Sequence, residues 1–351
     1  MHDVVVVGAG VFGAWTAYHL KRAGARVLLI DQHGAGNSRS SSSGETRIIR
    51  MSYGSSEIYT RSSMRSLKLW KEVCPSLFHN TGVLVTAAPS DPYLIDTRET
   101  LSRCGVPYEP LNARALGKRF PQISLDRATE GIWEPGSGVL MARRAVRAVV
   151  EASGVDYEIR TGGKNIRAGT VVYACGPWLP KLFPEILRGR IRPTRQEVFF
   201  FGTPPEYKCP FTWIAFREGV YSIPALDGRG FKIALDSHGP SFDPETGDRQ
   251  ITQEALRNTR AILRKRFPAL AGAPLVETRV CQYENTSNGD FLIDRHPHRK
   301  NVWLVGGGSG HGFKHGPWVG EYVASQIAGT APAEPRFSLE SKKTTRQRSV
   351  Y

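Results

Sequence analysis

The first thirty residues alternate between patterns typical of buried strands and of an amphipathic helix. The segment 3–31, DVVVVGAGVFGAWTAYHLKRAGARVLLID, begins with an apolar run, continues with apolar positions at helical spacing and ends in a second apolar run. A buried strand, a helix and another buried strand in this order are typical of a parallel βαβ unit. The pattern predicts that the chain opens with half of a Rossmann-like lobe.

Two later segments carry the same kind of pattern. Residues 169–180, GTVVYACGPWLP, contain an apolar run that ends at Gly176, and residues 301–329 have the pattern of a strand, a glycine-rich turn and a helix. Strands that return so late predict a discontinuous nucleotide-binding lobe, whereas an NAD dehydrogenase generally completes its Rossmann lobe in one continuous stretch. This arrangement favours FAD over NAD.

The segments between these parts predict a second lobe with a mainly antiparallel sheet, because they have strand-like alternation. A helical pattern interrupts them at residues 253–268. The strand-like segments are residues 81–89, 130–140, 195–203, 219–236 and 276–286.

The predicted fold class is a two-lobed α/β (α+β) protein, with a discontinuous Rossmann-like FAD-binding domain and a substrate domain. We assign the FAD-binding domain to residues 1–80, 138–194 and 287–335. We assign the substrate domain to residues 81–137 and 195–286. Residues 336–351 form a basic tail that we expect to be solvated or disordered.

Composition adds three constraints. A chain of 351 residues with 40% hydrophobic content is long enough for two lobes. No apolar run approaches the roughly 20 residues of a membrane helix, and the N-terminal residues lack the pattern of a signal peptide, so we expect a cytoplasmic protein. The five cysteines are odd in number and scattered, which predicts neither a disulfide framework nor a metal site.

The net positive charge of the chain is compatible with several classes of partner. The sequence has 47 Lys and Arg against 32 Asp and Glu, a formal net charge of +15, which suits nucleic acid, an anionic surface or an anionic ligand. Because the basic residues are spread along the chain, we expect no nucleic-acid partner. Because no apolar run is long enough for a span, we expect no membrane partner. A non-redox, basic nucleotide- or RNA-binding protein stays as an alternative of another class.

The glycines after the first strand complete a dinucleotide-binding fingerprint. Gly8 permits a tight turn, Gly10 lets the backbone approach a pyrophosphate, and Gly13 lets the helix pack on the strand. Asp31, at the end of the second strand, can accept a hydrogen bond from a ribose hydroxyl. The N-terminus of the helix would hold the pyrophosphate.

Together with this fingerprint, five further segments resemble the D-amino-acid-oxidase superfamily, and within it the monomeric sarcosine oxidases and N-methyltryptophan oxidases. They are SGETRIIRMSYG (43–54), EPGSGVL (134–140), GFKIALD (230–236), VCQYENTSNGDFLID (280–294) and GSGHGFKHG (308–316). The resemblance covers nearly the whole chain and implies an FAD lobe beside a sheet that covers the flavin ring. It also implies oxidation of secondary or N-methylated amino acids, with electrons passed to oxygen.

The resemblance implies a cofactor role for Cys281, because the related enzymes bond their flavin through a thioether at this position. A cysteine in an alternating strand is otherwise a small core hydrophobe, and that interpretation stays open. The other residues expected at the cofactor are Gly8, Gly10, Gly13, Asp31, Ser43, Thr46, Gly176, Gly310, Gly312 and Lys314.

An amino-acid substrate presents a carboxylate, which one planar guanidinium and one point charge bind well. Arg50 and Lys314 match the positions of this pair in the related oxidases, and Lys232 matches a lysine over the flavin, where a fixed cation stabilises forming superoxide. Three further positions match residues beside the flavin or in the substrate cavity: Arg47, Tyr221 and Tyr283. Core packing or a solvated charge stays the alternative interpretation of these residues.

Three departures from the sarcosine oxidase pattern are visible. Ser42 and Ser43 stand where these enzymes typically have a histidine pair, and Asp236 stands where they have a histidine four residues after the oxygen-site lysine. Asp236 would add negative charge near a substrate carboxylate or would pair with a cationic group of the substrate. The segment 154–176 is shorter than usual, which predicts a trimmed hairpin over the adenosine.

The function predicted from the sequence is FAD-dependent oxidation of a sarcosine-like amine. A hydride passes from the α or N-methyl carbon to flavin N5, O2 is reduced to H2O2, and the imine hydrolyses. We expect a monomer with FAD covalently bound through Cys281, whose partners are a small amino acid or amine with a carboxylate and molecular oxygen. The alternative is a non-covalent FAD dehydrogenase or imine-forming biosynthetic enzyme for a larger cyclic or aromatic amino acid.

Overall fold

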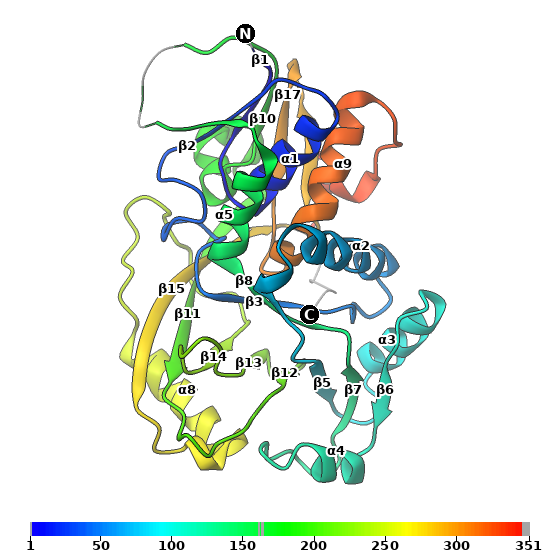
Figure 1. Ribbon diagram of the computed structural model, residues 1–351, viewed down its shortest axis with the longest axis vertical. Coiled ribbons are helices and arrows are strands. Elements are labelled where there is room, and N and C mark those ends of the chain that lie inside the picture. The colour runs from blue at the N-terminus through cyan, green and yellow to red at the C-terminus, as the bar shows by residue number, and fades with distance from the viewer. Residues whose placement is uncertain (1, 161, 163–164, 346–351) are drawn as a thin grey trace.

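Two lobes lie one above the other along the longest axis of the molecule (Figure 1). The computed structural model describes residues 2–160, 162 and 165–345. Within these residues the strands form sheets of six, eight and three strands. The six-stranded sheet belongs to the upper lobe in Figure 1 and the eight-stranded sheet to the lower lobe, so the predicted α/β fold class is confirmed.

The upper lobe is built on the six-stranded sheet, which has the order β16-β17-β10-β1-β2-β9. Its strands are β1 (His2–Val7), β2 (Val27–Asp31), β9 (Asp156–Ile159), β10 (Ala168–Tyr173), β16 (Leu292–His296) and β17 (Arg299–Gly306). All neighbours are parallel except β16 and β17, which run antiparallel. The strands come from three distant parts of the chain, and we call this the cofactor lobe.

Helix α1 (Val11–Arg22) lies against two other helices of this lobe, α5 (Ala142–Ser153) and α9 (Gly316–Ala328). Because helices and sheet cover it on several sides, its residues from Val11 to Ala17 are all buried. The segment therefore behaves less like the expected amphipathic helix than like a helix that is buried all round. A Cβ at Gly320 of α9 would lie 2.4 Å from the backbone of Trp15, so the helices touch backbone to backbone.

The lower lobe is built on the eight-stranded sheet, which has the order β15-β11-β14-β13-β12-β5-β7-β6. All neighbours are antiparallel except β12 and β5, so the sheet is mainly antiparallel, as expected. Its strands are β5 (Val83–Ala87), β6 (Glu109–Leu111), β7 (Glu130–Glu134), β11 (Ile191–Phe201), β12 (Thr212–Ala215), β13 (Val220–Ile223), β14 (Phe231–Leu235) and β15 (Leu275–Thr286). We call this the substrate lobe.

A small sheet of three strands lies between the lobes. Strand β8 (Gly138–Met141) pairs with both β3 (Thr46–Ile49) and β4 (Phe78–His79). The segment 130–140, which has one continuous strand-like pattern in the sequence, is therefore divided between β7 of the large sheet and β8 of the small one. Strand β3 carries Arg47 to the boundary between the lobes.

The remaining helices connect and cover these sheets. The α-helices are α2 (Glu57–Val73), α3 (Pro92–Arg103), α4 (Ala113–Arg119), α6 (Leu179–Leu182), α7 (Pro184–Leu187) and α8 (Gln253–Arg266). The 3-10 helices are η1 (Pro75–Leu77), η2 (Gly176–Trp178), η3 (Pro268–Leu270), η4 (Gly312–His315), η5 (Pro335–Phe337) and η6 (Glu340–Lys343).

The start of the C-terminal tail is packed, which corrects the expectation of a solvated end. Phe337 is fully buried in the core of the cofactor lobe. The Lys342 ammonium, in a side chain only 2% exposed, donates to Asn288 Oδ1 at 3.0 Å and to the carbonyl oxygen of Arg336 at 2.7 Å. An apolar anchor among basic residues therefore holds the segment, and the rest of the predicted tail, 346–351, lies outside the described residues.

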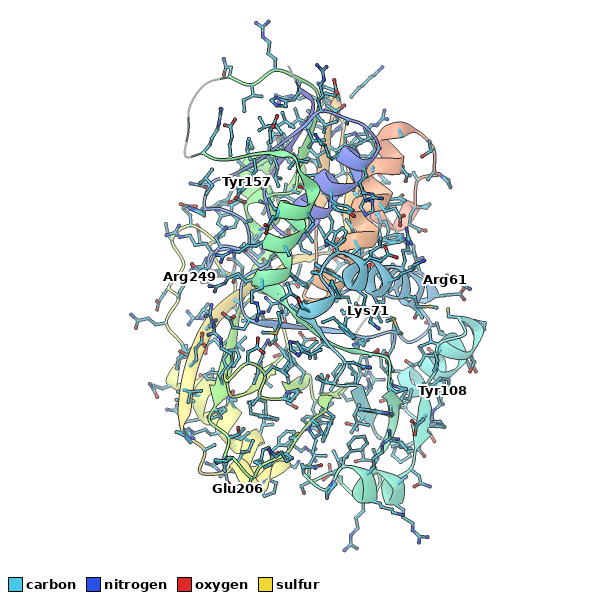
Figure 2. The ribbon with its side chains drawn as sticks, viewed as in Figure 1. Arg61, Lys71, Tyr108, Tyr157, Glu206 and Arg249 are labelled. Carbon is cyan, nitrogen blue, oxygen red and sulfur yellow. The ribbon has the colours of Figure 1, made fainter. Side chains whose placement is uncertain are left out.

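Charged side chains are distributed over both lobes (Figure 2), and Arg61 and Arg249 lie on opposite sides of the molecule in this view. All five cysteines are free. In the described part of the chain, no helix has the length and apolar content that a membrane span requires, and no group of His, Cys, Asp and Glu side chains is arranged to hold a metal ion. The expected trimmed hairpin falls partly on residues 161, 163 and 164, outside the described residues.

Candidate active site

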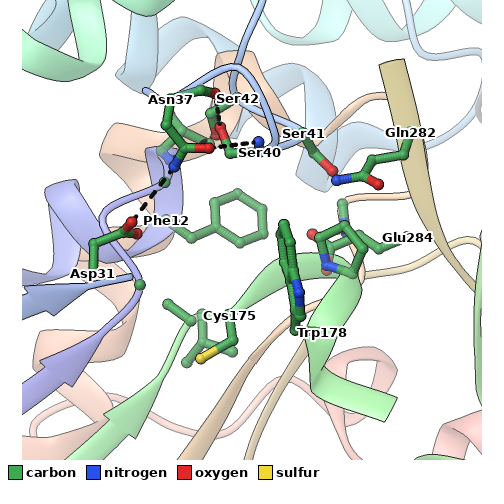
Figure 3. A pocket seen from close by; sticks show the side chains of 18 of the residues that line it. Phe12, Asp31, Asn37, Ser40, Ser41, Ser42, Cys175, Trp178, Gln282 and Glu284 are labelled. Atoms are coloured by element: carbon green, nitrogen blue, oxygen red, sulfur yellow. Dashed lines mark hydrogen bonds between the residues drawn. The ribbon is translucent and has the colours of Figure 1, made fainter. Parts of the chain in front are cut away.

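Two adjoining cavities lie between the lobes. The larger one, of about 430 Å³, lies along the carboxyl ends of β1, β2 and β10 (Figure 3). The smaller one, of about 100 Å³, is lined by residues of β11 to β15 and of the glycine-rich turn before α9. They share Arg47, Tyr283, Gly310 and Phe313. A ligand in the first cavity can therefore meet a ligand in the second.

The fingerprint glycines are required by close backbone contacts. Gly8 has a φ of 103°, and a Cβ there would lie 2.4 Å from the carbonyl oxygen of Ala174. A Cβ at Gly13 would lie 1.8 Å from the carbonyl oxygen of Gly8, so any side chain would separate α1 from β1. The N-terminus of α1 opens into the larger cavity, where Val11 N–H donates to Ser42 Oγ at 2.9 Å. Backbone amides and the helix dipole make this end suited to a phosphate.

The carboxylate of Asp31 organises the loop that follows β2. Its Oδ1 accepts from the amides of His33 and Gly34 at 2.8 Å each, and its Oδ2 accepts from the amide of Ala9 at 2.7 Å. An ionised carboxylate has about four acceptor sites, so Oδ2 retains capacity for a hydroxyl of a ligand. Asp31 lines the larger cavity, as its expected role requires.

Six of the predicted cofactor residues line the larger cavity, Cys281 and Lys314 line the smaller one, and Gly13 lines neither. Those lining the larger cavity are Gly8, Gly10, Asp31, Gly176, Gly310 and Gly312. Ser43 and Thr46 line neither cavity: their carbonyl oxygens accept from Arg47 Nη2 at 2.7 Å and Nη1 at 2.9 Å, respectively. These two residues hold the arginine, and a direct role for their side chains at the cofactor stays a prediction.

Arg47 and Cys281 meet where the cavities join. Arg47 Nη2 donates to Cys281 Sγ at 3.5 Å, and the guanidinium carbon lies 5.8 Å from the centre of the Phe313 ring. Cys281 is half-buried and lines the smaller cavity. The sulfur is thus accessible from the junction, which a thioether to a ring placed there requires.

Arg50 and Lys314 both contact Tyr53. The Lys314 ammonium donates to Tyr53 Oη at 2.7 Å and to the carbonyl oxygen of His311 at 3.0 Å, and the Arg50 guanidinium carbon lies 4.6 Å from the centre of the Tyr53 ring. Arg50 also donates to Tyr93 Oη at 3.1 Å. Both cations are at least 92% buried and both line the smaller cavity.

A buried carboxylate fixes the backbone next to Arg50. Glu134 accepts from the amides of Met51 and Ser52 at 2.7 and 2.9 Å and from Ser137 Oγ at 2.5 Å. Burial raises the pKa of this carboxyl, although the hydrogen bonds and the Arg50 charge act in the opposite direction. Glu134 therefore both positions Arg50 and balances its charge.

Lys232 extends from β14 to the junction of the cavities. Its ammonium donates to the carbonyl oxygen of Thr46 at 3.1 Å and lies 5.3 Å from the centre of the Tyr221 ring. The side chain is only 3% exposed. Burial, followed by the nearby Arg47 charge, lowers the pKa of this lysine to about 7. Its charge is therefore sensitive to pH near neutrality.

Tyr283 and Asp236 form a hydrogen-bonded pair in the wall of the smaller cavity. Tyr283 Oη donates to Asp236 Oδ1 at 2.6 Å. Burial, and then the Asp236 charge, raise the pKa of the tyrosine well above its usual value. Asp236 is thus oriented by Tyr283.

All seven predicted catalytic residues line this one cavity of about 100 Å³. They are Arg47, Arg50, Tyr221, Lys232, Asp236, Tyr283 and Lys314. Four further residues of the site were not predicted from the sequence. Tyr53 and Tyr93 contact the two cations, and Gln282 and Glu284 line the larger cavity. The alternation along residues 281–284 predicts that Gln282 and Glu284 share one face of the strand, but not which face meets the cofactor.

The residues of the larger cavity fit a dinucleotide. The fingerprint turn and the N-terminus of α1 suit its phosphates, and the acidic residue at the end of β2 suits its ribose. The cavity continues towards a cationic site, where its ring would lie. A dinucleotide cavity that opens onto a small cationic cavity defines the class of flavin-dependent oxidoreductases.

The comparison with known families gives the same result. The DAO family, described as FAD dependent oxidoreductase, matches residues 3–326, and the chain belongs to this family. The protein is accordingly an FAD-dependent oxidoreductase that acts on the CH–NH group of donors. Family membership sets aside the non-redox nucleotide- or RNA-binding alternative.

Individual relatives resemble the chain over nearly its full length. A monomeric sarcosine oxidase of Bacillus sp. (strain B-0618) is 32% identical over 372 residues, which cover 97% of this chain and 95% of that protein. An N-methyl-L-tryptophan oxidase of Citrobacter koseri is 27% identical, over 98% of this chain and 99% of its own length. The solved structure of L-proline dehydrogenase from P. horikoshii has a TM-score of 0.85 and 22% identity, covering 98% of this chain and 99% of that chain.

Proposed function

We propose that the protein oxidises a small secondary or N-methylated amino acid, with sarcosine as the simplest example. The observation that carries this proposal is the pair of buried cations, Arg50 and Lys314, held around Tyr53 in a cavity that joins the cofactor cavity. A guanidinium fork and an ammonium suit one carboxylate. A carboxylate bound there leaves the amine and its carbon substituents facing the junction.

The residues of the chain would position the substrate and stabilise charge. When bound, FAD accepts the hydride from the α or N-methyl carbon and passes both electrons to O2, which takes up two protons to become H2O2. Arg50 and Lys314 hold the carboxylate, and Tyr221 and Tyr283 line the sides of the cavity. Lys232, at the junction, supplies a buried cation where oxygen acquires negative charge. The imine product is hydrolysed by water.

The amine has to lose a proton before it can donate a hydride. The cations Arg47, Arg50 and Lys314 lower the pKa of an amine bound among them, so the neutral amine is favoured without a dedicated general base. Asp236 acts in the opposite direction and offers an acceptor to a substrate N–H. The balance between these charges sets which amines the enzyme oxidises.

The size of the smaller cavity supports a small substrate. Its volume of about 100 Å³ is well below the roughly 300–1,000 Å³ typical of sites for larger ligands. Three residues argue against sarcosine itself as the substrate, because they stand where sarcosine oxidases typically have histidines: Ser42, Ser43 and Asp236. These departures keep a larger cyclic or aromatic amino acid as the second candidate.

We further propose that the protein is a monomer in the cytoplasm, and that nucleic acid and membranes are not its partners.

We also propose that Cys281 bonds FAD covalently. The position of the sulfur at the junction of the cavities supports the covalent bond. The test is to precipitate the purified yellow protein with acid. Flavin colour that stays with the pellet, and that moves to the supernatant in Cys281→Ala, is the expected result. Colour in the wild-type supernatant would contradict the covalent bond.

Substrate oxidation is tested by measuring H2O2 with sarcosine, N-methyl-L-tryptophan and L-proline at matched concentrations. We expect the highest kcat/KM with sarcosine or a similarly small N-methyl amino acid. In Arg50→Lys, the KM for this substrate should rise by 10-fold or more, since the fork geometry is lost while the charge is kept. Preference for a cyclic or aromatic substrate would support the second candidate instead.

A further inference from the structure

Glu284 is a buried acid that the proposed chemistry does not use. It follows Cys281 and Tyr283 on β15, but the alternation of the strand turns its side chain, like that of Gln282, to the larger cavity. Figure 3 shows Gln282 and Glu284 extending from one strand towards the cavity, across from Asp31. The side chain of Glu284 is 7% exposed.

The carboxyl group of Glu284 is only half satisfied. Its Oε1 accepts from the amide of Gly308 at 3.2 Å, whereas Oε2 is buried and has no hydrogen-bond partner within the described residues. A carboxyl without partners is costly to bury, so such a group in a cavity wall indicates a missing ligand. The terminal torsion of a glutamate is broad, so the carboxyl can turn to present either oxygen to the cavity.

The position of Glu284 along the cavity indicates which part of the cofactor it meets. Gly176 and Gly308 lie next to its carboxyl group, and both line the larger cavity. The phosphate-binding end of α1 lies at one part of this cavity, and Arg47, where the ring is expected, lines another part. Between the phosphates and the ring of FAD lies the ribityl chain, which carries hydroxyl groups.

We propose that Glu284 binds a hydroxyl of the ribityl chain of FAD and serves as a cofactor-binding residue. The proposal rests on FAD as the cofactor and is independent of the amine that is oxidised. Burial raises the pKa of this carboxyl to about 7, although the amides of Gly308 and Gly307 act in the opposite direction. Below this pH the neutral acid can both donate and accept, and it adds no negative charge near the phosphates.

Other ionisable groups near Glu284 do not obscure this titration. Cys175, on the turn after β10, is an ionisable neighbour. Burial, together with the Glu284 charge, keeps the pKa of its thiol far above neutrality. Asp31, His33, Arg47 and Arg160 line the same cavity from other segments. A variant that differs only at Glu284 separates its contribution from theirs and from that of Lys232, which titrates in the same range.

The test measures FAD binding rather than turnover. In a Cys281→Ala background, which prevents a covalent link, flavin-free protein is titrated with FAD by fluorescence at pH 6 and pH 8.5. From pH 6 to pH 8.5, the FAD affinity of the background protein should fall about tenfold more than that of Glu284→Gln, because the glutamine stays neutral and keeps a donor and an acceptor. Glu284→Leu should bind FAD about tenfold more weakly than Glu284→Gln at pH 6.

Two controls locate the contact. Glu277→Gln, on the same strand but outside both cavities, should leave the FAD affinity and its pH dependence unchanged. ADP, which lacks the ribityl chain, should bind Glu284→Gln and Glu284→Leu equally. If Glu284→Leu weakens ADP as much as FAD, the contact is to the adenosine diphosphate and the ribityl assignment is wrong.

If the Cys281→Ala background protein binds no FAD, a second measurement replaces the titration. With Cys281 intact, purified Glu284→Gln should carry as much flavin per chain as the wild type, and Glu284→Leu clearly less. Equal flavin content in Glu284→Gln and Glu284→Leu overturns the inference about Glu284 while the proposed oxidase stands. A wild-type protein that neither carries nor binds FAD overturns both.

Discussion

Lys232 and Glu284 are two buried side chains whose charges respond to the same pH range. Burial lowers the pKa of the lysine to about 7 and raises that of the glutamate to about 7. As the pH rises through neutrality, the lysine loses its positive charge and the glutamate becomes negative. Both changes make the cofactor site less favourable for negative charge, so neutral to slightly acidic conditions should favour FAD binding and oxygen reduction.

Replacing Lys232 tests the oxygen reaction. In Lys232→Met, the rate constant for reoxidation of the reduced enzyme by O2 should fall about 100-fold, because a fixed cation is lost where superoxide forms. Reduction of the flavin by substrate should change by only a few-fold. Stopped-flow absorbance measures both steps separately.

In the wild type, the reoxidation rate constant should decrease as the pH rises through about 7, since Lys232 then loses its proton. Lys300→Met, which removes an exposed lysine of β17, should leave both steps unchanged. A Lys232→Met enzyme that reacts with O2 at the wild-type rate would show that the cation has no such role.

Replacing Glu284 also tests the stability of the flavin-free protein. A carboxyl whose folded pKa is about 7, against a usual value of 4.5, binds its proton more tightly in the folded state. Wild-type stability should therefore fall as the pH rises from about 4.5 to about 7 and stay lowered above it. At pH 8.5, Glu284→Gln should be more stable by up to about 3 kcal/mol, and by less than about 1 kcal/mol at pH 5.

Urea unfolding of the flavin-free proteins at the two pH values measures this difference. A gain that is equal at pH 5 and pH 8.5 would show that Glu284 does not titrate between them.

At the scale of single elements, the sequence predicted where strands lie along the chain better than it predicted which strands pair and which face of a strand meets the cofactor. The alternation of residues 276–286 predicts β15, and the structure confirms that strand. Which face of β15 meets the cofactor depends on its pairing with β11 and on the lobe opposite, so Gln282 and Glu284 could not be assigned from the local pattern alone. The division of residues 130–140 between β7 and β8 also could not be predicted from the local pattern, because it depends on partner strands that are distant in sequence.

Strand β7 offers a matched pair of acids. Glu134, at its end, is buried and hydrogen-bonded to the backbone beside Arg50, whereas Glu130, at its start, is one-third exposed and pairs with Arg98. Glu134→Ala should lower the free energy of unfolding by about 3–5 kcal/mol, because it leaves amides unsatisfied and the Arg50 charge uncompensated. Glu130→Ala should cost less than about 1 kcal/mol.

Urea unfolding of the holoprotein measures both values. Similar losses in the two variants would mean that Glu134 is not needed to hold Arg50.

At the scale of the whole molecule, one carboxylate joins the two lobes. Glu45, just before β3, is 6% exposed and lies close to the guanidinium groups of Arg279, Arg229 and Arg143, at 2.9, 3.2 and 3.6 Å. Arg143 belongs to α5 of the cofactor lobe, and Arg279 belongs to β15 of the substrate lobe. This cluster accounts for part of the basic excess, which the sequence alone did not explain.

Removing this carboxylate should loosen the contact between the lobes. Glu45→Gln should lower the free energy of unfolding by about 1–3 kcal/mol, since Glu277 alone then faces three partly solvated arginines. The loss should shrink at high salt, which screens the repulsion between these arginines. Melting temperatures at low and high NaCl concentrations test this expectation.

Glu245→Gln serves as the control, because it removes an exposed carboxylate that is paired with Arg39. Its effect should stay within about 1 kcal/mol at either salt concentration. If Glu45→Gln behaves in the same way, the cluster contributes nothing to the union of the lobes.

The strand order of the cofactor lobe also constrains how the protein is made. Val4 of β1 pairs with Thr170 of β10, and Val172 of β10 pairs in turn with Trp303 of β17. At synthesis rates of about 5–20 residues per second, the nascent chain keeps its first strand unpaired on that side for on the order of ten seconds. The glycine-rich turn that closes the cofactor cavity is translated later still. The complete cavity therefore exists only in a nearly finished chain, and we expect a message cut short before this turn to yield product with little bound flavin.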